Sequence, residues 1–248
     1  YTVVFADITY SIVAKIIDLS NLSISNTTKT YTGEKQSVTI SLKDADLGMP
    51  EGLSANVVYR YEQAGTEVDP INVGTYTVSA ILSTKNDNYA LPADYSITGT
   101  LTITPKALEI TLNDTAKTSS IYGEEIASYV KDTDFTVVGI VERDEAKDLG
   151  ITVKAYKEYV EATETEVASK IELQAGDNVG TYPIKAEVAD SNYTVVFADK
   201  TYSIVAKVID LSNLSISNTT ETYTGEKQEV QISLKDADLG MPEGLSAN

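Results

Sequence analysis

Apolar and polar residues alternate over several short segments, the pattern of a strand with one buried face. Between Ser37 and Leu42, for example, the apolar residues are Val38, Ile40 and Leu42. The same period of two recurs at Val57/Tyr59/Tyr61, Tyr76/Val78/Ala80/Leu82, Leu108/Ile110/Leu112 and Tyr182/Ile184/Ala186/Val188. Turn residues separate these segments, at Thr32-Gly33, Pro50-Glu51-Gly52, Ala64-Gly65 and Gly176-Asp177. The pattern predicts an all-β chain of short strands.

Three segments depart from simple alternation. The stretches Glu124–Lys131 and Asp144–Leu149 are compatible with short helices, and Asp144 is a suitable N-cap residue for the second. Pro183 interrupts an alternating segment. Because proline donates no backbone hydrogen bond, we expect that strand to lie at a sheet edge or to carry a bulge.

The chain repeats part of itself. Residues 1–56 return as residues 193–248, identical at 51 of 56 positions and offset by 192 residues. The five differences are Ile8/Lys200, Ile16/Val208, Lys29/Glu221, Ser37/Glu229 and Thr39/Gln231. Two of them fall on the polar phase of the alternating segment that begins at Ser37, while its apolar residues return unchanged. Such self-similarity is typical of tandem arrays, and we expect the copies to differ on the surface and agree in the core.

A finer repeat divides the 192-residue period into two unlike modules. Similar closing sequences lead to Lys15, Lys106 and Lys207, and similar opening sequences follow each lysine. The predicted domains are module A (16–106) and module B (107–207), flanked by a truncated B-type C-terminal hairpin (1–15) and the N-terminal part of a truncated A-type module (208–248). Both modules contain Asn-Val-Gly-Thr-Tyr, at residues 72–76 and 178–182.

The junctions contain no Gly/Ser linker, and Pro105 stiffens the one between modules A and B. We therefore expect consecutive domains to be joined end to end with limited bending. The predicted fold is a tandem array of small Ig-like β-sandwich domains, with a β-grasp-like module as the alternative.

Composition excludes several kinds of chemistry. The 248 residues include no cysteine and no histidine, which removes disulfides, zinc–thiolate sites and Ser-His-Asp or Cys-His catalysis. The net charge of −18 argues against nucleic acid and anionic membranes as partners. No run of apolar residues is long enough to cross a membrane. We expect a non-catalytic chain without a cofactor, and divalent cations are the one partner that such a charge could attract.

Both modules resemble MBG-type repeats of large bacterial surface proteins. In module B the matching segments are Ile121-Tyr122-Gly123-Glu124, Gly139-Ile140-Val141…Asp144…Leu149, Val179-Gly180-Thr181-Tyr182, Asn192-Tyr193-Thr194-Val195 and Thr201-Tyr202-Ser203-Ile204. In module A they are Thr30-Tyr31-Thr32-Gly33, Pro50-Glu51-Gly52-Leu53, Asn72-Val73-Gly74-Thr75-Tyr76, Asn88-Tyr89 and Thr100-Leu101-Thr102-Ile103. The resemblance implies tandem all-β domains in secreted or wall-attached proteins, often adhesins, and no catalytic activity.

Recurring tyrosines are the first candidate site. Exposed tyrosines can stack on sugars, whereas core tyrosines bond the local backbone through their hydroxyls. Their recurrence in two unlike modules favours the core interpretation. The residues concerned are Tyr31, Tyr76, Tyr89, Tyr122, Tyr182 and Tyr193.

Acidic groups are the second candidate. The clusters at 43–46, 131–134 and 142–145 could supply oxygens to Ca²⁺, but each contains a lysine or arginine, which favours solvated turns. Glu161 and Glu164 could act as an acid/base pair, and a surface role is favoured. A Lys–Asn isopeptide bond needs a buried lysine, and the sequons at 26–28 and 113–115 matter only in a glycosylating pathway. No catalytic, cofactor or metal residue is assigned.

These observations predict a rigid, acidic stalk segment of a bacterial surface protein that projects a separate adhesive or functional head. Two alternatives stay open. The repeats themselves could bind a host glycan or protein multivalently, as an adhesin. The chains could also associate through strand edges into an extracellular filament.

Overall fold

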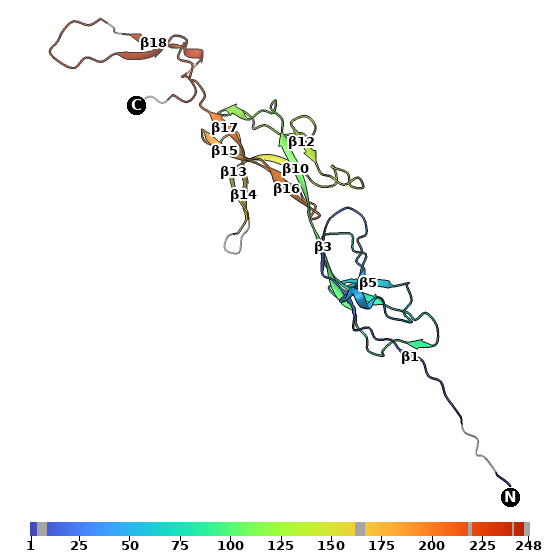
Figure 1. Cartoon of the computed structure of the whole chain (residues 1–248). Coiled ribbons are helices and arrows are strands. Elements are labelled where there is room, and N and C mark those ends of the chain that lie inside the picture. Colours follow the sequence, from blue (N-terminus) through green and yellow to red (C-terminus); the bar gives the residue numbers. More distant parts are fainter. Residues whose placement is uncertain (4–8, 162–166, 218–219, 240, 246–248) are drawn as a thin grey trace. The chain divides into compact units, whose positions relative to one another are not determined.

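The computed structural model describes residues 1–3, 9–161, 167–217, 220–239 and 241–245 (Figure 1). Strands dominate, and over these ranges the helical segments are two 3₁₀ turns, η1 (Ala45–Leu47) and η2 (Ala237–Leu239). The all-β expectation is confirmed. Both predicted helices are wrong, because 125–130 has no regular structure and 146–150 forms turns.

Contacts divide the chain into two compact units. Unit 1 comprises residues 1–116, 129–153 and 186–198, and unit 2 comprises residues 117–128, 154–185 and 199–248. Each unit is described by itself.

Unit 1 contains a five-stranded sheet in the order β3-β9-β7-β5-β6. Its strands are β3 (Thr27–Thr30), β9 (Thr98–Thr104), β7 (Gly74–Ile81), β5 (Val58–Gln63) and β6 (Thr66–Glu67). Neighbours are antiparallel except β3 and β9, which are parallel. The predicted alternation is realised along β7, where Tyr76, Val78 and Ala80 are buried and the intervening residues are not.

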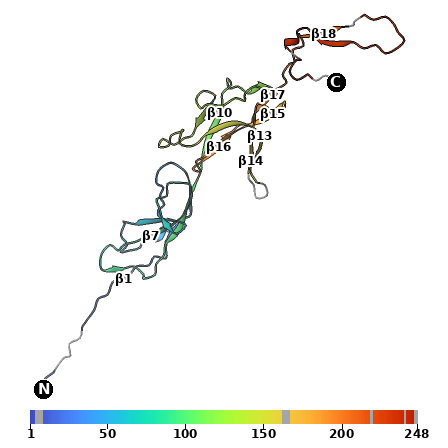
Figure 2. The same ribbon diagram turned by 180° about the vertical axis from the view of Figure 1, so that it is seen from behind.

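Smaller sheets complete unit 1. β2 (Leu22–Ile24) pairs with β4 (Ile40–Leu42), and β1 (Lys15–Ile16) pairs with β8 (Tyr89–Ala90). A third sheet has the order β12-β10-β16, with β12 (Phe135–Val138), β10 (Lys106–Leu112) and β16 (Tyr193–Phe197). β10 and β16 lie side by side in both views of the ribbon (Figures 1 and 2).

One hydrophobic core runs through unit 1. Buried residues from 22–103 form a single cluster with Leu108, Val141, Leu149 and Tyr193. Only Pro105 separates β9 from β10, so the expectation of a junction without a flexible linker is confirmed. Chain direction at this junction is therefore fixed both by the continuous strands and by the shared core.

Unit 2 repeats the order of the larger sheet, as β11-β17-β15-β13-β14. The strands are β11 (Ser119–Ile121), β17 (Lys200–Val205), β15 (Gly180–Glu187), β13 (Thr152–Val160) and β14 (Ser169–Glu172). The edge position expected for the strand with Pro183 is wrong, because β15 lies between β17 and β13, and Pro183 opposes Thr201 in continuous register. A residue in a strand directs its N–H to one neighbour only, so this proline removes a single ladder bond.

Nearly identical sequence adopts two structures in this chain. The hairpin predicted for residues 1–15 includes 4–8, which lie outside the described residues, but in the second copy residues 193–205 form β16 and β17, which belong to different sheets and not to one hairpin. In the first copy, residues 9–14 form no strand, and the side chains of Tyr10, Ile12 and Val13 are exposed. The strand structure of this sequence depends on partner strands such as β10 and β15.

The second repeated half, 208–248, keeps its local pairing. β18 (Leu214–Ser217) opposes β19 (Gln231–Leu234) in the same register as β2 and β4. Val38 is 5% exposed in unit 1, whereas its repeat Val230 is 61% exposed. Of the differing positions, Ile8 lies outside the described residues, and Lys29 is half-buried. The prediction that the copies differ on the surface is confirmed for Ile16/Val208, Ser37/Glu229 and Thr39/Gln231, which are exposed in both copies.

Candidate functional site

A carboxylate that accepts two tyrosine hydroxyls lies at the centre of the most connected polar site in unit 1. Oδ2 of Asp144 accepts hydrogen bonds from the Tyr31 hydroxyl at 2.9 Å and from the Tyr193 hydroxyl at 2.6 Å. Tyr31 follows β3, Asp144 lies in the turn after β12, and Tyr193 opens β16. Three segments, of which Tyr31 and Tyr193 lie 113 and 49 residues from Asp144 in sequence, therefore converge on one carboxylate.

Backbone groups hold this carboxylate in place. The Asp144 N–H donates to the Val141 carbonyl at 3.0 Å, which closes the turn that presents the side chain. The Val141 N–H in turn donates to the Tyr193 hydroxyl at 3.1 Å. The helix predicted to start at Asp144 does not form, and the acidic side chain bonds the tyrosines instead of capping.

The two tyrosine rings pack against each other edge to face. Their centroids are 5.4 Å apart at an interplanar angle of 78°, a favourable aromatic geometry. Tyr31 and Tyr193 are only 5% and 3% exposed. Burial, and then the hydrogen bond to Asp144, raises the pKa of Tyr31 to about 12. The same two causes raise the pKa of Tyr193.

Further bonds surround this centre. Arg143 donates from Nη1 to the Gly33 carbonyl at 3.1 Å. Gly33 has φ +76°, and a Cβ there would approach Cγ2 of Val141 to 3.1 Å, so both conformation and space favour glycine. Asn192 accepts from the Val73 N–H at 2.8 Å through Oδ1. We call this set the joint, formed by Tyr31, Gly33, Asn72, Val73, Val141, Arg143, Asp144, Asn192 and Tyr193.

A related arrangement surrounds the other Asn-Tyr pair of unit 1. The Tyr89 hydroxyl donates to Oε1 of Glu51 at 3.1 Å, and Nζ of Lys15 pairs with Oε2 at 3.0 Å. The Lys15 N–H donates to the Asn88 carbonyl at 2.8 Å, as the Lys106 N–H donates to the Asn192 carbonyl at 2.9 Å. Each predicted junction lysine of unit 1 is thus bonded to an Asn-Tyr pair whose tyrosine bonds a carboxylate.

Two glycines of the repeat permit a matched test of this arrangement. Gly52 and Gly244 have φ +87° and +88°, but an added Cβ would lie 2.2 Å from the Tyr89 ring at Gly52 and no closer than 3.6 Å to any atom at Gly244. We expect Gly244→Ala to lower the free energy of unfolding by about 1 kcal/mol, because of backbone strain. Gly52→Ala should lower it by about 3 kcal/mol, because the added Cβ also collides with the Tyr89 ring. Thermal unfolding of the two variants measures the difference. Equal losses would contradict the tight contact at Gly52.

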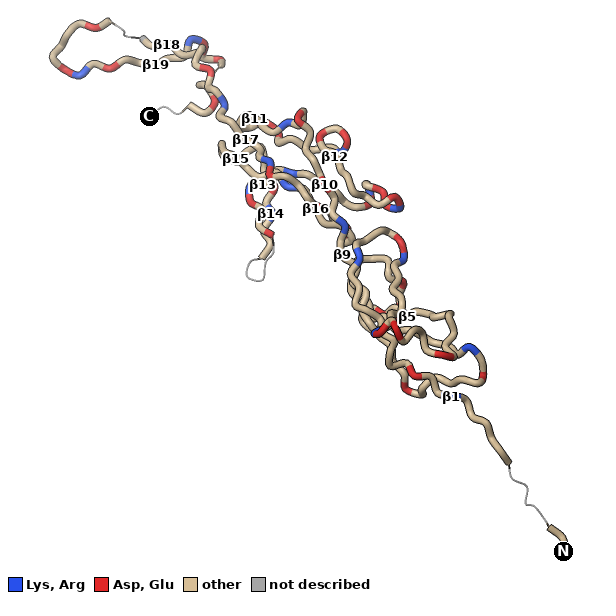
Figure 3. The backbone as a smooth tube through the Cα atoms, in the orientation of Figure 1, with Lys and Arg blue, Asp and Glu red and all other residues tan. Residues whose placement is uncertain are grey.

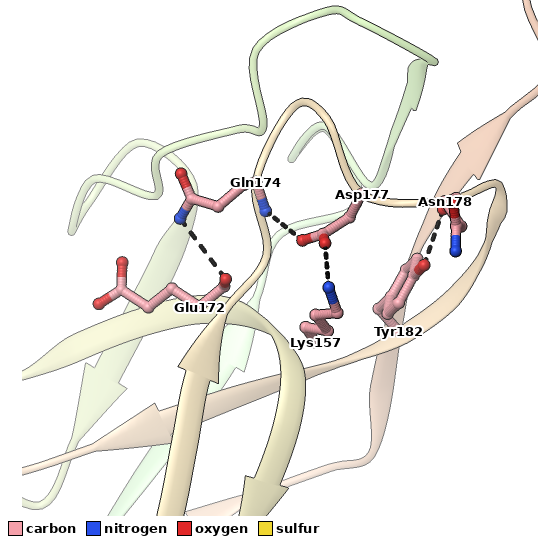
Figure 4. Close-up of polar contacts among 6 residues, drawn as sticks. All are labelled: Lys157, Glu172, Gln174, Asp177, Asn178 and Tyr182. Carbon is pink, nitrogen blue, oxygen red and sulfur yellow. Dashed lines mark hydrogen bonds and ion pairs between the residues drawn. The ribbon is translucent and has the colours of Figure 1, made fainter.

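Other recurring tyrosines bond local backbone, as favoured from sequence. The Tyr76 hydroxyl donates to the Asn72 carbonyl at 2.6 Å, and Tyr182 donates to the Asn178 carbonyl at 2.7 Å (Figure 4). Tyr122 differs, because its side chain is 46% exposed. The recurring tyrosines thus include local corner residues, two partners of Asp144 and one exposed ring.

A polar network in unit 2 fixes the turn before Asn178 (Figure 4). Asp177 pairs with Nζ of Lys157 at 2.5 Å and accepts the Gln174 N–H at 2.8 Å. The hydrogen bond from Lys157, followed by that from the Gln174 backbone, lowers the pKa of Asp177. The hydrogen bond to Asp177 raises the pKa of Lys157. This confirms a turn at Gly176-Asp177 and gives its acidic residue a structural partner.

Several of the other acidic candidates bond neighbouring groups. Asp44 caps η1, Asp134 accepts the Val130 N–H, and Lys131 pairs with Asp132. Acidic residues scatter over the loops in Figure 3, interleaved with basic ones. Over the described ranges, no three His, Cys, Asp or Glu residues are grouped so as to hold a metal ion. Glu161 accepts from Tyr159, and Glu164 lies outside the described residues.

The sequence does not predict the joint, although it gives each of its three central residues another role. Tyr31 and Tyr193 are predicted to be core tyrosines, and Asp144 is a candidate calcium ligand or N-cap residue. The motifs Asn-Val-Gly and Asn-Tyr gave the available signal, because Asn72, Val73 and Asn192 meet in the joint. Their bonds span about 120 residues, a distance that local patterns do not encode.

Comparison with known families places part of the chain. Residues 20–107 match the family described as the MBG domain, which confirms the resemblance to MBG-type repeats for this segment. No curated protein matches the chain. The described residues contain no helix long and apolar enough to span a membrane.

Two solved structures are similar at low level. One is the adhesin InvE of Yersinia pseudotuberculosis, at 14% identity over 76% of this chain and 60% of that one, with a TM-score of 0.28. The other is SGBP-B of the Bacteroides ovatus mixed-linkage glucan utilization locus in complex with a heptasaccharide, at 12% identity over 85% and 57%, with a TM-score of 0.21. This chain thus spans less than two thirds of either. TM-scores this low support no statement about its function.

Proposed function

We propose that this chain is a structural stalk segment of a repetitive, adhesin-like bacterial surface protein that holds a separate functional head away from the cell. The joint is the observation that carries the proposal. It ties the segment that matches the MBG domain, 20–107, to the segment that follows through a shared core, a buried Tyr–Asp–Tyr cluster and a junction without a flexible linker. A spacer needs such resistance to bending, whereas a flexible tether does not.

The rest of the proposal follows from sequence. A near-identical copy at an offset of 192 residues suits a function that grows with repeat number. The charge of −18 suits a soluble surface exposed outside the cell. We propose no catalytic role, no resident cofactor, and neither nucleic acid nor membrane insertion for this segment.

Small-angle X-ray scattering on the purified chain tests the stalk. A compact particle of 248 residues has a radius of gyration of about 18 Å, and we expect a value well above that. A value near 18 Å would contradict a spacer. The matched experiment measures scattering from the Asp144→Ala variant. Its distribution of interatomic distances should be broader, because the joint loses its central hydrogen-bond acceptor and the chain bends more freely there.

A glycan array separates the stalk from the multivalent adhesin. The chain and a longer polypeptide with two copies of residues 1–192 are compared on one array. Specific binding that grows with copy number would favour the adhesin and overturn a purely structural role. We expect background signal from both.

A further inference from the structure

A cavity of about 970 Å³ in unit 2 is unexplained by the proposed stalk role. The residues that line it form two walls. The first wall includes Tyr122, Asn178 and Val179, and the second includes Lys207, Glu243 and Gly244. Tyr122 and Val179 are 46% and 55% exposed, which is unusual for an aromatic and a β-branched residue next to ordered strands. Each wall repeats a set of residues whose contacts are known from unit 1.

The second wall repeats the surroundings of Tyr89. Lys207, Glu243 and Gly244 stand 192 residues after Lys15, Glu51 and Gly52, and the ion pair is conserved between the copies, at 2.5 Å for Lys207–Glu243. In unit 1 the Lys15 N–H donates to the Asn88 carbonyl, and the Tyr89 ring covers Gly52. In unit 2 no described residue accepts from the Lys207 N–H. No ring covers Gly244, where an added Cβ would meet only the Ile209 side chain, at 3.6 Å, among the described residues.

The first wall matches the part of the joint that receives Asn192 and Tyr193. Asn178-Val179 repeats Asn72-Val73, whose Val73 N–H donates to Asn192. Tyr122 corresponds in position to Tyr31. Tyr31 directly follows β3 and donates its N–H to the Thr104 carbonyl at the end of β9, the parallel neighbour of β3. Tyr122 directly follows β11 and donates its N–H to the Val205 carbonyl at the end of β17, the parallel neighbour of β11. In the joint, Tyr31 packs against Tyr193.

We infer that the cavity is an acceptor site for an Asn-Tyr pair at the start of an extended segment with the sequence of Asn88–Ala90, supplied by a second copy of residues 57–106. The joint and the Tyr89 site together define its contacts. The Lys207 N–H donates to the asparagine carbonyl, and the Val179 N–H donates to the asparagine side chain. The incoming tyrosine donates to Glu243, covers Gly244 and meets the edge or face of Tyr122.

The exposed face of residues 208–248 identifies this occupant. Val230 and Ile232 are 61% and 65% exposed, whereas Val38, the counterpart of Val230, is buried and donates its N–H to Tyr61. Tyr61 belongs to the 57–106 segment that completes the sheets of unit 1. A second copy of that segment would cover the same apolar residues, and its Asn-Tyr pair would reach the cavity. The inference is independent of the stalk role, since it concerns only which segment binds.

A titration with a short peptide tests the site. The ¹⁵N-labelled 248-residue chain is titrated with a synthetic peptide of residues 84–95, which carries Asn88-Tyr89-Ala90. We expect saturable shifts of the Lys207 and Val179 amides with a dissociation constant of about 1 mM, because only two strand residues and two side chains are engaged. The Lys15 and Val73 amides, whose acceptors are already present, should not shift.

Matched variants make the result specific. Glu243→Gln should weaken peptide binding about tenfold, whereas Glu51→Gln, at the same position of the other copy, should leave it unchanged. A peptide with phenylalanine in place of Tyr89 should also bind about tenfold more weakly. Gly244→Ala should abolish binding, because its Cβ takes the place of the ring.

Two outcomes would overturn the inference. The first is the absence of shifts at Lys207 and Val179 with about 5 mM peptide, several times the expected dissociation constant. The second is binding that is indifferent to both Glu243→Gln and the tyrosine substitution, which would indicate an unspecific apolar contact. Failure of the stalk proposal in scattering would leave either result unchanged, so the two are distinguishable.

Discussion

Replacing Asp144 with alanine is expected to lower the free energy of unfolding by about 3 kcal/mol, because two buried tyrosine hydroxyls lose a charged acceptor at once. Tyr31→Phe should lower the free energy of unfolding by less, because it removes one of the two hydrogen bonds to Asp144 and leaves the ring in place. Chemical denaturation followed by tyrosine fluorescence measures both losses.

Glu145→Ala provides the control, because Glu145 is the adjacent residue and its side chain is exposed and pairs with Lys147. That change should alter stability by less than about 0.5 kcal/mol. The combined Tyr31→Phe and Asp144→Ala variant should lose less than the sum of the single losses, since both remove the same bond. Strict additivity would show that the two residues do not interact in solution.

Alkaline pH is expected to destabilise unit 1 between about pH 10 and 12. The pKa of Tyr31 is raised to about 12 in the folded chain, against about 10 for an unfolded tyrosine. The unfolded chain therefore releases its proton first as the pH rises, and the stabilisation present below pH 10 is lost up to pH 12. Two pKa units correspond to about 2–3 kcal/mol, and Tyr193 shifts in the same direction.

Denaturation midpoints measured in half-unit steps from pH 8.5 upward test this prediction. Because other tyrosines and lysines also titrate in this range, the informative quantity is the difference between the parent chain and Tyr31→Phe. The parent should lose stability more steeply, and the two curves should converge at the highest pH. Parallel curves would show that folding does not raise the pKa of Tyr31, which would contradict the prediction.

Local alternation was sufficient to predict strands but not their partners. The segments with a period of two form β5, β7, β10 and β15, because a strand with one buried face needs alternating apolar and polar residues. The sequence does not indicate in the same way which strand will be the neighbour. A hairpin was predicted for residues 1–15, whereas their second copy at 193–205 forms two strands of separate sheets. The edge position assigned to Pro183 failed for the same reason.

The site was less predictable than the fold. Asp144 is an ordinary N-cap residue by sequence, and only the approach of Tyr31 and Tyr193 makes it the centre of the joint. Residues 1–15 and 193–207 differ at one position, yet 9–14 form no strand, whereas their counterparts belong to β17 up to Val205. Tertiary partners decide these outcomes, and a pattern of a few residues does not contain them.

The alternation of two unlike modules has a consequence for biosynthesis. While a repetitive chain emerges from the ribosome, a half-made domain can pair with the wrong copy of itself, and this risk is greatest when adjacent domains are alike. Here the two five-stranded sheets share one strand order but have different side chains, and the long near-identical repeat is offset by 192 residues. Each nascent module can therefore find its own second half before a competing copy has been translated.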